Sequence, residues 1–539
     1  MSAAARRWAF AVLLAASGAA AAPPGRTVEE WRHTIEPGDT LIGLTTQYLR
    51  EGIGWRRLQA YNRVADPLRL RPGRTLRAPL AWVREDPAPA EAVRVTDPVT
   101  LMRQGQANPL SPGDRVQAGD VLEAGPGGAA TLRFGDGTRA LVRPDTRVEL
   151  ERAVRLGPEG PHATGLHLDQ GSIDTVVPPS PRSPPRYDIR TRTVNLGVRG
   201  TEFRAHAEAG TAVTRVEVLE GRVALGERQV VAAGFGAVAD PGGGLPAPRA
   251  LLPAPSLSGL PERVDRVPLR FAWTPQPGAQ AYRVQVLDPQ DDEHLLLDGR
   301  VGTPLAQWPD LPDGQYRLAV RSIDATGLEG ETARWNFVLK ARPEPPFLSG
   351  PLDGARVYGA QVGFGWTRSA AAARYRFQLA DEPTFARPMA DRPGLDTTEQ
   401  VLDLPPGRYH WRVASIRLDG DQGPYSDAQA FELREIPPSP QLQAPEASKE
   451  GMVVRWRARE GARYRYQLAR DESFDTLLLD ATTDEPQASL GKLSAGRYHL
   501  RVQTIDADGY AGPFGPAQRI EVPRSAGWLL LPLLLLLLL

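Results

Sequence analysis

The strongest constraint on the fold is a repeat of about 90 residues in the C-terminal half of the chain. Trp273, Trp366 and Trp456 each open one copy, and 42 or 43 residues after each tryptophan comes a tyrosine of matching context, namely Tyr316, Tyr409 and Tyr498. About 90 residues is the size of one β-sandwich domain. The pattern therefore predicts three sandwiches in series, with the tryptophan on an early strand and the tyrosine at a tyrosine corner.

Proline-rich segments at 342–346 and 436–440 separate the copies. The predicted repeats span residues 256–341, 346–435 and 438–523. Through the Trp…Tyr spacing and a Gly-x-Tyr pattern they resemble fibronectin type III domains. The resemblance implies a role in spacing or in protein contact.

Residues 93–240 are predicted to form a separate β domain. Alternating residues at 130–134, a turn at 135–138 and a return strand at 140–142 have the chemistry of a hairpin. Short strands with glycine corners continue to residue 240, which favours a β-solenoid or a sandwich-like domain. A Pro/Ala/Glu stretch at 86–92 is expected to be a linker before it.

Two passages of this domain, 129–138 and 193–203, followed by 216–223, resemble the FecR domain, and the resemblance covers about residues 95–235. In founding members this domain belongs to a periplasmic regulator that passes a signal from an outer-membrane receptor to a sigma factor. Such signalling also uses a cytoplasmic region and an internal membrane helix, which this sequence does not display. The resemblance therefore implies an envelope interaction domain.

Residues 31–80 are predicted to form a small α+β module of order βααβ. The strand at 33–35 turns at Pro37-Gly38, and Asp39 or Thr40 is expected to cap a helix that runs to residue 49. The second helix is expected at 55–62, and a closing strand within 68–79. Trp55, Leu58 and Tyr61 lie three residues apart and are predicted to face the core.

Over its whole length this module resembles the LysM domain. The resemblance implies binding of N-acetylglucosamine-containing polymers such as peptidoglycan by two loops, one after the first strand and one before the second. Carried over by position, the predicted glycan-binding residues are Gly38, Asp39, Thr40, Leu41, Asn62, Val64, Asp66 and Leu68. The glycine-rich segment 50–54 and six nearby arginines depart from the family pattern.

Both ends of the chain are apolar. Arg6-Arg7, an apolar run at 8–16 and small residues at 17–22 form a predicted signal peptide, residues 1–22, which implies export to the periplasm or cell envelope. Residues 526–539 are shorter than the ~20 residues of a spanning helix. Three alternatives fit this tail: an anchor that gives membrane association, a sorting signal that is removed, or a disordered end.

Charge and composition exclude several functions. The 64 basic and 64 acidic side chains balance, which removes the general electrostatic argument for nucleic acid. Arginines scattered through strands are interpreted as solvated surface. The absence of cysteine excludes disulfides and thiolate catalysis. The seven dispersed histidines show no metal-binding spacing, so no metal and no cofactor are expected.

We therefore expect a multi-domain, mainly β envelope protein without catalytic activity. It would bind peptidoglycan through its N-terminal module and present its β domains to an unidentified envelope protein. One alternative is a sensor or regulatory component of envelope signalling. The other is a glycan hydrolase, because acidic residues are abundant enough to supply a pair of carboxylates.

Overall fold

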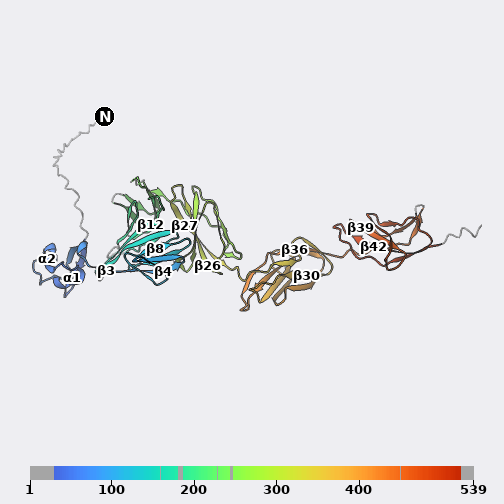
Figure 1. The fold of residues 1–539 in the computed structure, drawn as a ribbon, viewed down its shortest axis with the longest axis horizontal. Helices are drawn as coiled ribbons and strands as arrows, with labels where there is room; N and C mark the ends of the chain where they lie inside the picture. Colours follow the sequence, from blue (N-terminus) through green and yellow to red (C-terminus); the bar gives the residue numbers. More distant parts are fainter. Residues whose placement is uncertain are drawn as a thin grey trace, which may run out of the picture. The chain divides into compact units, whose positions relative to one another are not determined.

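The computed structural model describes residues 30–157, 160–179, 186–198, 200–226, 229–242, 247–448 and 451–523 (Figure 1). The chain divides into two compact units, Met1–Lys340 and Ala341–Leu539. The predicted signal peptide and the apolar tail lie outside the described residues. Among the residues that are described, no helix has the length and apolar character needed to cross a membrane.

The first unit begins with the predicted βααβ module, whose elements are β1 (Glu30–Thr34), α1 (Leu41–Tyr48), α2 (Trp55–Asn62), β2 (Thr75–Pro79) and the short 3-10 helix η1 (Leu80–Trp82). Of the two cap candidates, Thr40 caps α1, since its Oγ1 accepts a hydrogen bond from the Gly43 N–H at 3.0 Å. Helix α2 ends where Arg63 adopts a left-handed conformation, φ 52°. The two strands pair antiparallel.

The core of this module continues into the next domain. Leu41, Leu58 and Leu76 form its centre, and Leu156 and Ala163 of the following β domain belong to the same buried cluster. Backbone hydrogen bonds cross at the same place, for example from the Gly157 N–H to the Arg84 carbonyl at 2.9 Å. The two domains therefore share apolar packing.

In its described residues the β domain has eighteen strands, whose pairings close into a barrel. Its longest strand, β12 (His162–Val176), pairs antiparallel with β11 and β15 and parallel with β13. The other strands are β3 (Glu85–Pro87), β4 (Ala90–Thr96), β5 (Val99–Arg103), β6 (Gln106–Pro109), β7 (Arg115–Val116), β8 (Val121–Ala124), β9 (Ala129–Arg133), β10 (Arg139–Val142), β11 (Thr146–Leu156), β13 (Arg186–Arg190), β14 (Asn195–Val198), β15 (Glu202–Ala207), β16 (Thr214–Glu220), β17 (Arg222–Leu225), β18 (Gln229–Ala232), β19 (Phe235–Ala239) and β20 (Arg249–Ala250).

The stretch expected to be a linker before this domain is instead part of its sheet. Pro87 of β3 pairs with Val154 of β11, and the Ala88 N–H donates to the Ala153 carbonyl at 2.9 Å. Proline has no backbone N–H and therefore cannot donate a hydrogen bond to a neighbouring strand. It is tolerated at the end of a short strand, where that donor is not required. The interpretation of this segment as a linker, which rested on its composition, was wrong.

The first repeat completes unit 1 with two sheets. One is formed by β22 (Leu269–Ala272) and β25 (Leu305–Trp308), and the other has the order β21-β27-β26-β23-β24. The strands of the second sheet are β21 (Arg263–Val264), β23 (Ala281–Asp288), β24 (Asp291–Val301), β26 (Gly314–Ile323) and β27 (Glu329–Leu339).

The second unit contains the other two repeats, each built as two sheets over one core. Repeat 2 consists of β28 (Leu348–Gly350), β29 (Ala355–Tyr358), β30 (Gln361–Trp366), β31 (Arg374–Ala380), β32 (Ala390–Leu395), β33 (Glu399–Asp403), β34 (Gly407–Ile416), β35 (Gln422–Tyr425) and β36 (Gln429–Arg434). Repeat 3 consists of β37 (Glu446–Ser448), β38 (Gly451–Arg455), β39 (Arg463–Ala469), β40 (Leu477–Thr483), β41 (Gln487–Ser489), β42 (Gly496–Ile505) and β43 (Gln518–Val522).

The residues that defined the repeat occupy equivalent positions. Trp273, Trp366 and Trp456 are all buried, with 7%, 4% and 3% of their surface exposed. Each repeat tyrosine donates its hydroxyl hydrogen to the carbonyl oxygen four residues earlier, at 2.6–2.8 Å, and these pairs are Tyr316–Pro312, Tyr409–Pro405 and Tyr498–Ser494. The mainly β fold and the tyrosine corners predicted from the sequence are confirmed.

Candidate functional site

The two loops predicted to bind glycan leave the same end of the β1–β2 sheet. Thr34, at the end of β1, pairs with Thr75, at the start of β2. Just beyond, the Ile35 N–H donates to the Arg74 carbonyl and the Gly73 N–H donates to the Ile35 carbonyl, both at 2.8 Å. One loop follows β1 and the other precedes β2, so both start from this end.

The first loop is held by Asp39. Its Oδ2 accepts the Glu36 N–H and contacts His33 Nε2, both at 2.8 Å. Partial burial acts to raise the pKa of Asp39, but the Glu36 hydrogen bond and His33 outweigh it and lower this pKa below its ordinary value. Asp39 therefore stays ionised at neutral pH. Gly38, with φ 100°, makes the preceding turn in a conformation that favours glycine.

Three of the eight predicted residues connect the loops to the body of the module. Leu41 is buried and Val64 packs partly buried against the same core. Asn62 joins α2 to β2: its Nδ2 donates to the Leu58 and Arg77 carbonyls at 2.9 and 2.7 Å, and its Oδ1 accepts the Arg77 N–H at 2.7 Å. These three side chains support the two loops by packing on the core or by bonding α2 to β2.

The second loop presents its side chains to solvent. Asp66 is exposed, and its Oδ1 accepts the Leu68 N–H at 2.9 Å, which closes a small turn. This turn holds Leu68 with 92% of its surface exposed. An apolar side chain kept in water on a stable turn is a contact point available to a ligand such as a sugar ring.

The aromatic face predicted for α2 is only partly in the core. Leu58 is fully buried and Trp55 is half-buried, but Tyr61 is exposed and donates its hydroxyl hydrogen to Glu30 Oε1 at 2.7 Å. Tyr61 also contacts the ring of Trp82 edge-on, with 5.3 Å between ring centroids. The interpretation of Tyr61 as a core residue was wrong, because its helix face meets the chain after β2 at the surface.

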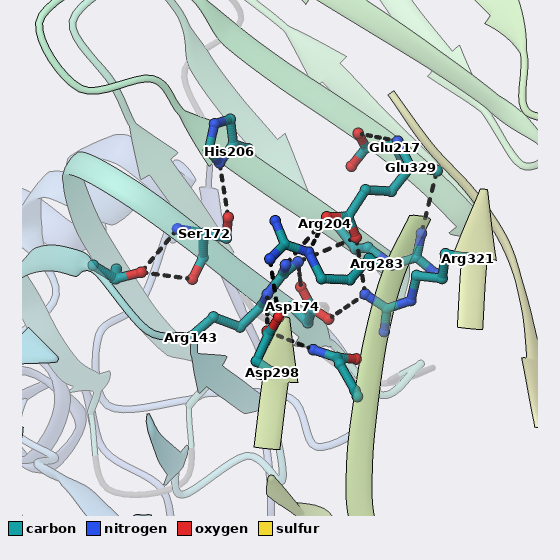
Figure 2. A network of polar contacts seen from close by, with 12 residues as sticks. Arg143, Ser172, Asp174, Arg204, His206, Glu217, Arg283, Asp298, Arg321 and Glu329 are labelled. Carbon is teal, nitrogen blue, oxygen red and sulfur yellow. Dashed lines mark hydrogen bonds and ion pairs between the residues drawn. The ribbon is translucent and has the colours of Figure 1, made fainter. Parts of the chain in front are cut away.

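A cluster of buried charged side chains, which the sequence did not predict, lies where the β domain meets the first repeat (Figure 2). At its centre is Arg143, only 3% exposed. Its guanidinium donates to both carboxylate oxygens of Glu329 at 3.1 and 3.2 Å and to Asp298 at 3.1 Å, and it lies 3.4 Å from Asp174. Arg321 of the repeat reaches back to Asp174 at 3.1 Å.

Electrostatics keep most of this cluster charged. Burial acts to raise the pKa of Glu329, but Arg143, Arg283 and the other nearby arginines hold it well below its ordinary value. Glu217 differs: burial and the neighbouring Glu329 raise its pKa to about 8, so it is protonated at neutral pH. Its Oε1 accepts the Glu329 N–H at 3.1 Å, a bond that the protonated form retains.

The same region contains a serine–histidine pair, Ser172 Oγ and His206 Nδ1, 2.8 Å apart. Burial, followed by Arg215 and Arg143, lowers the pKa of His206 to about 4. An imidazole of such low pKa is a weak general base at neutral pH. In the described part of the chain no carboxylate is bonded to this histidine, so the pair lacks the third group of a catalytic triad.

The three repeats contain a sequence signal for the contact between the β domain and the first repeat. Each repeat has an Arg-x-Gln on one strand and an Asp thirteen residues after the Gln, and in all three the Gln amide bonds that Asp at 2.9–3.1 Å; the sets are Arg283/Gln285/Asp298, Arg376/Gln378/Asp391 and Arg465/Gln467/Asp480. In repeats 2 and 3 this face is covered by an arginine between two aromatic rings, Arg412 and Arg501.

Repeat 1 has Ala319 at the corresponding position. Ala319, Leu287 and Leu295 form a small apolar cluster with Ala129 and Leu141 of the β domain. The acid Glu329 has Gln422 as its counterpart in repeat 2. Repeat 1 therefore differs from its copies at the positions that contact the β domain.

Models of two known protein families match parts of this chain. The LysM domain model matches residues 33–79, and the FecR protein model matches residues 120–224. No curated protein matches the chain.

Three solved structures give low TM-scores. Fibronectin domains FN1–FN3 of chicken CNTN1 align at 16% identity and TM-score 0.22 over 51% of this chain and 99% of that one. Fibronectin(III)-like modules of Clostridium thermocellum CbhA align at 12% identity and 0.23 over 34% and 96%. A Parabacteroides distasonis protein assigned as an anti-sigma factor aligns at 16% and 0.20 over 24% of this chain and 59% of its own length.

The LysM match covers the module with the two loops, and the FecR match covers the part of the β domain, residues 120–224, that contains Arg143 and Arg204. The three two-sheet repeats with tyrosine corners follow it in the chain. The chain thus combines a LysM domain and a FecR domain with β repeats of two sheets each.

Proposed function

We propose that this protein is an exported, non-catalytic component of the bacterial cell envelope that binds peptidoglycan through its LysM domain. The match at residues 33–79 is the observation that carries the proposal. The contact surface would be formed by the residues of the two loops that remain accessible, Gly38, Asp39, Thr40, Asp66 and Leu68. Leu41, Asn62 and Val64 would support it.

The remaining domains would act by protein contact in the periplasm or cell envelope. The FecR domain and the repeats offer binding surfaces, and the partner would be another envelope protein. The weak basicity of His206 beside Ser172 supports a role without catalysis.

Binding to isolated sacculi tests this function. The mature chain should sediment with insoluble peptidoglycan, and Leu68→Ala should weaken sedimentation because it removes an apolar contact without touching the core. The matched control is Leu418→Ala, which alters a leucine that is 93% exposed in repeat 2. Equal sedimentation of the Leu68 variant, the control and a chain without residues 31–80 would refute glycan binding by this domain.

The same samples test export and catalysis. Mass spectrometry of the cellular protein should find a mature N-terminus close to residue 22 in the envelope fraction. Incubation with sacculi should release no soluble muropeptides beyond a heat-killed control. Release of such fragments would support the alternative of a glycan hydrolase.

A signalling role is the second candidate, favoured by the shared packing of the first two domains. Leu156 and Ala163 of the FecR domain lie in the LysM core, so glycan engagement would act directly on the FecR domain. Cross-linking in cells with and without Leu68→Ala distinguishes this candidate: a sensor should change its protein partners when glycan binding is lost.

A further inference from the structure

A cavity lies at the contact between the FecR domain and the first repeat, within unit 1. Its volume is about 230 Å³, whereas one water needs only ~10–15 Å³ on the same measure. Arg204 and Arg215 line it from the FecR domain, and Arg283 and Arg300 line it from the repeat. The cavity is therefore walled by guanidinium groups from both domains and is large enough for a small ligand.

Positive charge exceeds negative charge around this cavity. The cavity wall and the ion cluster bonded to it contain six guanidinium and five carboxyl groups: Arg143, Arg204, Arg215, Arg283, Arg300 and Arg321 against Asp174, Glu208, Glu217, Asp298 and Glu329. Because the pKa of Glu217 is raised to about 8, one of the five carboxyl groups is neutral at pH 7. Two positive charges are then without a matching negative charge.

Two of the arginines show where this excess lies. Arg204 is 3% exposed, yet its hydrogen bonds all go to neutral acceptors: the carbonyls of Glu329 and Gly330 at 3.3 and 2.9 Å, and Thr332 Oγ1 at 2.8 Å. A buried cation without a bonded anion is costly. Burial, followed by repulsion from Arg321, lowers the pKa of Arg204 to about 10, which reflects that cost.

Arg300 lines the same cavity and is exposed to solvent. It pairs across the strands with Arg283, so two like charges face each other in the ladder. Among the described side chains, Arg300 has no hydrogen-bond or ion-pair partner. Its donors are free to bind a ligand that enters the cavity.

We propose that this cavity binds a small oxyanion, a carboxylate or a phosphate group, between Arg204 and Arg215 on one side and Arg283 and Arg300 on the other. Planar guanidinium groups bind both kinds of oxyanion with paired, charge-assisted hydrogen bonds. Since the ligand contacts both domains, its binding stabilises their contact by mass action. This site is independent of the glycan-binding loops.

Calorimetric titration of the full mature chain tests the site, with sodium phosphate and sodium succinate as separate probes at constant ionic strength set by sodium chloride. We expect saturable binding of at least one probe with one site per chain. A phosphate-only or succinate-only result identifies the source of the oxyanion. Absence of saturable binding with both probes would overturn the proposal.

Two variants locate the binding. Arg300→Gln removes an exposed guanidinium that has no partner, so the fold should persist, and affinity should fall about tenfold or more with the loss of a charge-assisted contact. The matched control is Arg270→Gln, an exposed arginine on β22 of the same repeat, which should bind as the wild type does. Equal affinity of Arg300→Gln and the wild type would show that the anion binds elsewhere.

A third variant separates this proposal from glycan binding. Leu68→Ala should leave the titration unchanged, because Leu68 belongs to the LysM loop. Conversely, Arg300→Gln should leave sedimentation with sacculi unchanged. A change in anion affinity in Leu68→Ala would contradict the independence of the two sites.

Discussion

Arg143 of the FecR domain and Glu329 of the first repeat form a bidentate ion pair. Nη1 and Nη2 of Arg143 each donate to a different carboxylate oxygen of Glu329, at 3.2 and 3.1 Å. The two residues are 186 positions apart in the chain, and both are withdrawn from solvent. Paired geometry of this kind fixes orientation as well as distance. The first repeat is thereby held in one register on the FecR domain.

Arg143→Met should destabilise unit 1 by ~3–5 kcal/mol, because it leaves Asp174, Asp298 and Glu329 buried with one cation fewer. The corresponding loss at the surface is small: Arg465→Met removes the exposed pair with Asp480 in repeat 3 and should cost about 0–1 kcal/mol. Urea unfolding followed by hydrogen exchange of peptides from each unit measures both. Similar costs for the two variants would mean that the buried pair contributes no more than a surface pair.

Glu217 should make unit 1 less stable as the pH rises from about 4.5 towards 8. The folded-state pKa is about 8 and the ordinary value is 4.5, so in this window the unfolded chain releases a proton that the folded chain retains. The stability of the wild type should therefore fall relative to Glu217→Gln by up to ~1.4 kcal/mol per pH unit. Gln keeps an oxygen that can accept the Glu329 N–H.

Hydrogen exchange of peptides from residues 214–220, measured for both chains between pH 5 and 8.5 and corrected for the intrinsic exchange rate, gives this difference. Glu521→Gln on β43 serves as the control, since its side chain is exposed. Parallel pH profiles for the wild type and Glu217→Gln would show that the carboxyl group is already ionised in the folded state.

Trp273→Ala and Trp456→Ala should expose different parts of the chain to protease. Truncating a buried tryptophan costs ~3–5 kcal/mol, enough to unfold a marginal domain. Loss of repeat 1 would also strip Arg143 and Arg204 of their partners, so Trp273→Ala should expose the FecR domain to protease. Trp456→Ala should leave residues 90–240 resistant. Limited proteolysis with mass spectrometry of the fragments distinguishes these outcomes, and a protected FecR domain in Trp273→Ala would contradict the coupling.

Asn62→Ala should destabilise the LysM domain by about 0.5–1.5 kcal/mol, because it removes the exposed hydrogen bond between Asn62 at the end of α2 and the Arg77 N–H on β2. Leu68→Ala should leave thermal stability unchanged. Unfolding followed by hydrogen exchange of residues 55–79 measures both variants. If Asn62→Ala folds as stably as the wild type but loses sacculus binding, Asn62 is a direct glycan contact.

The sequence predicted what depends on local chemistry and missed what depends on distant partners. Trp366 and Tyr409 were recognisable because each copy must fill the same core position and satisfy the same carbonyl. The α1 cap was limited to Asp39 or Thr40 by local hydrogen bonding, and the structure selects Thr40. Arg143 and Arg321, by contrast, were interpreted as solvated because nothing near them in sequence identifies Glu329 or Asp174 as partners.

The predicted glycan site divides in the same way. The two loops were placed by the pattern of the module, but their individual side chains could not be. Asn62 and Val64 were assigned to the site by position, and only the fold shows that Asn62 bonds β2 and that Val64 packs on the core. Leu68 was predicted as a glycan-binding residue by its position in the second loop, and only the fold shows that the Asp66 turn keeps its side chain in water.

Repeat 1 has Ala319 at the position where repeats 2 and 3 have Arg412 and Arg501. The three copies are therefore not equally free to change during evolution. Ala319 belongs to a contact that the FecR domain constrains, so the first copy can alter this face only together with its neighbour. The later copies cover the same face with their own arginine and aromatic rings. Gain or loss of a later copy would lengthen or shorten the protein while leaving the FecR contact intact.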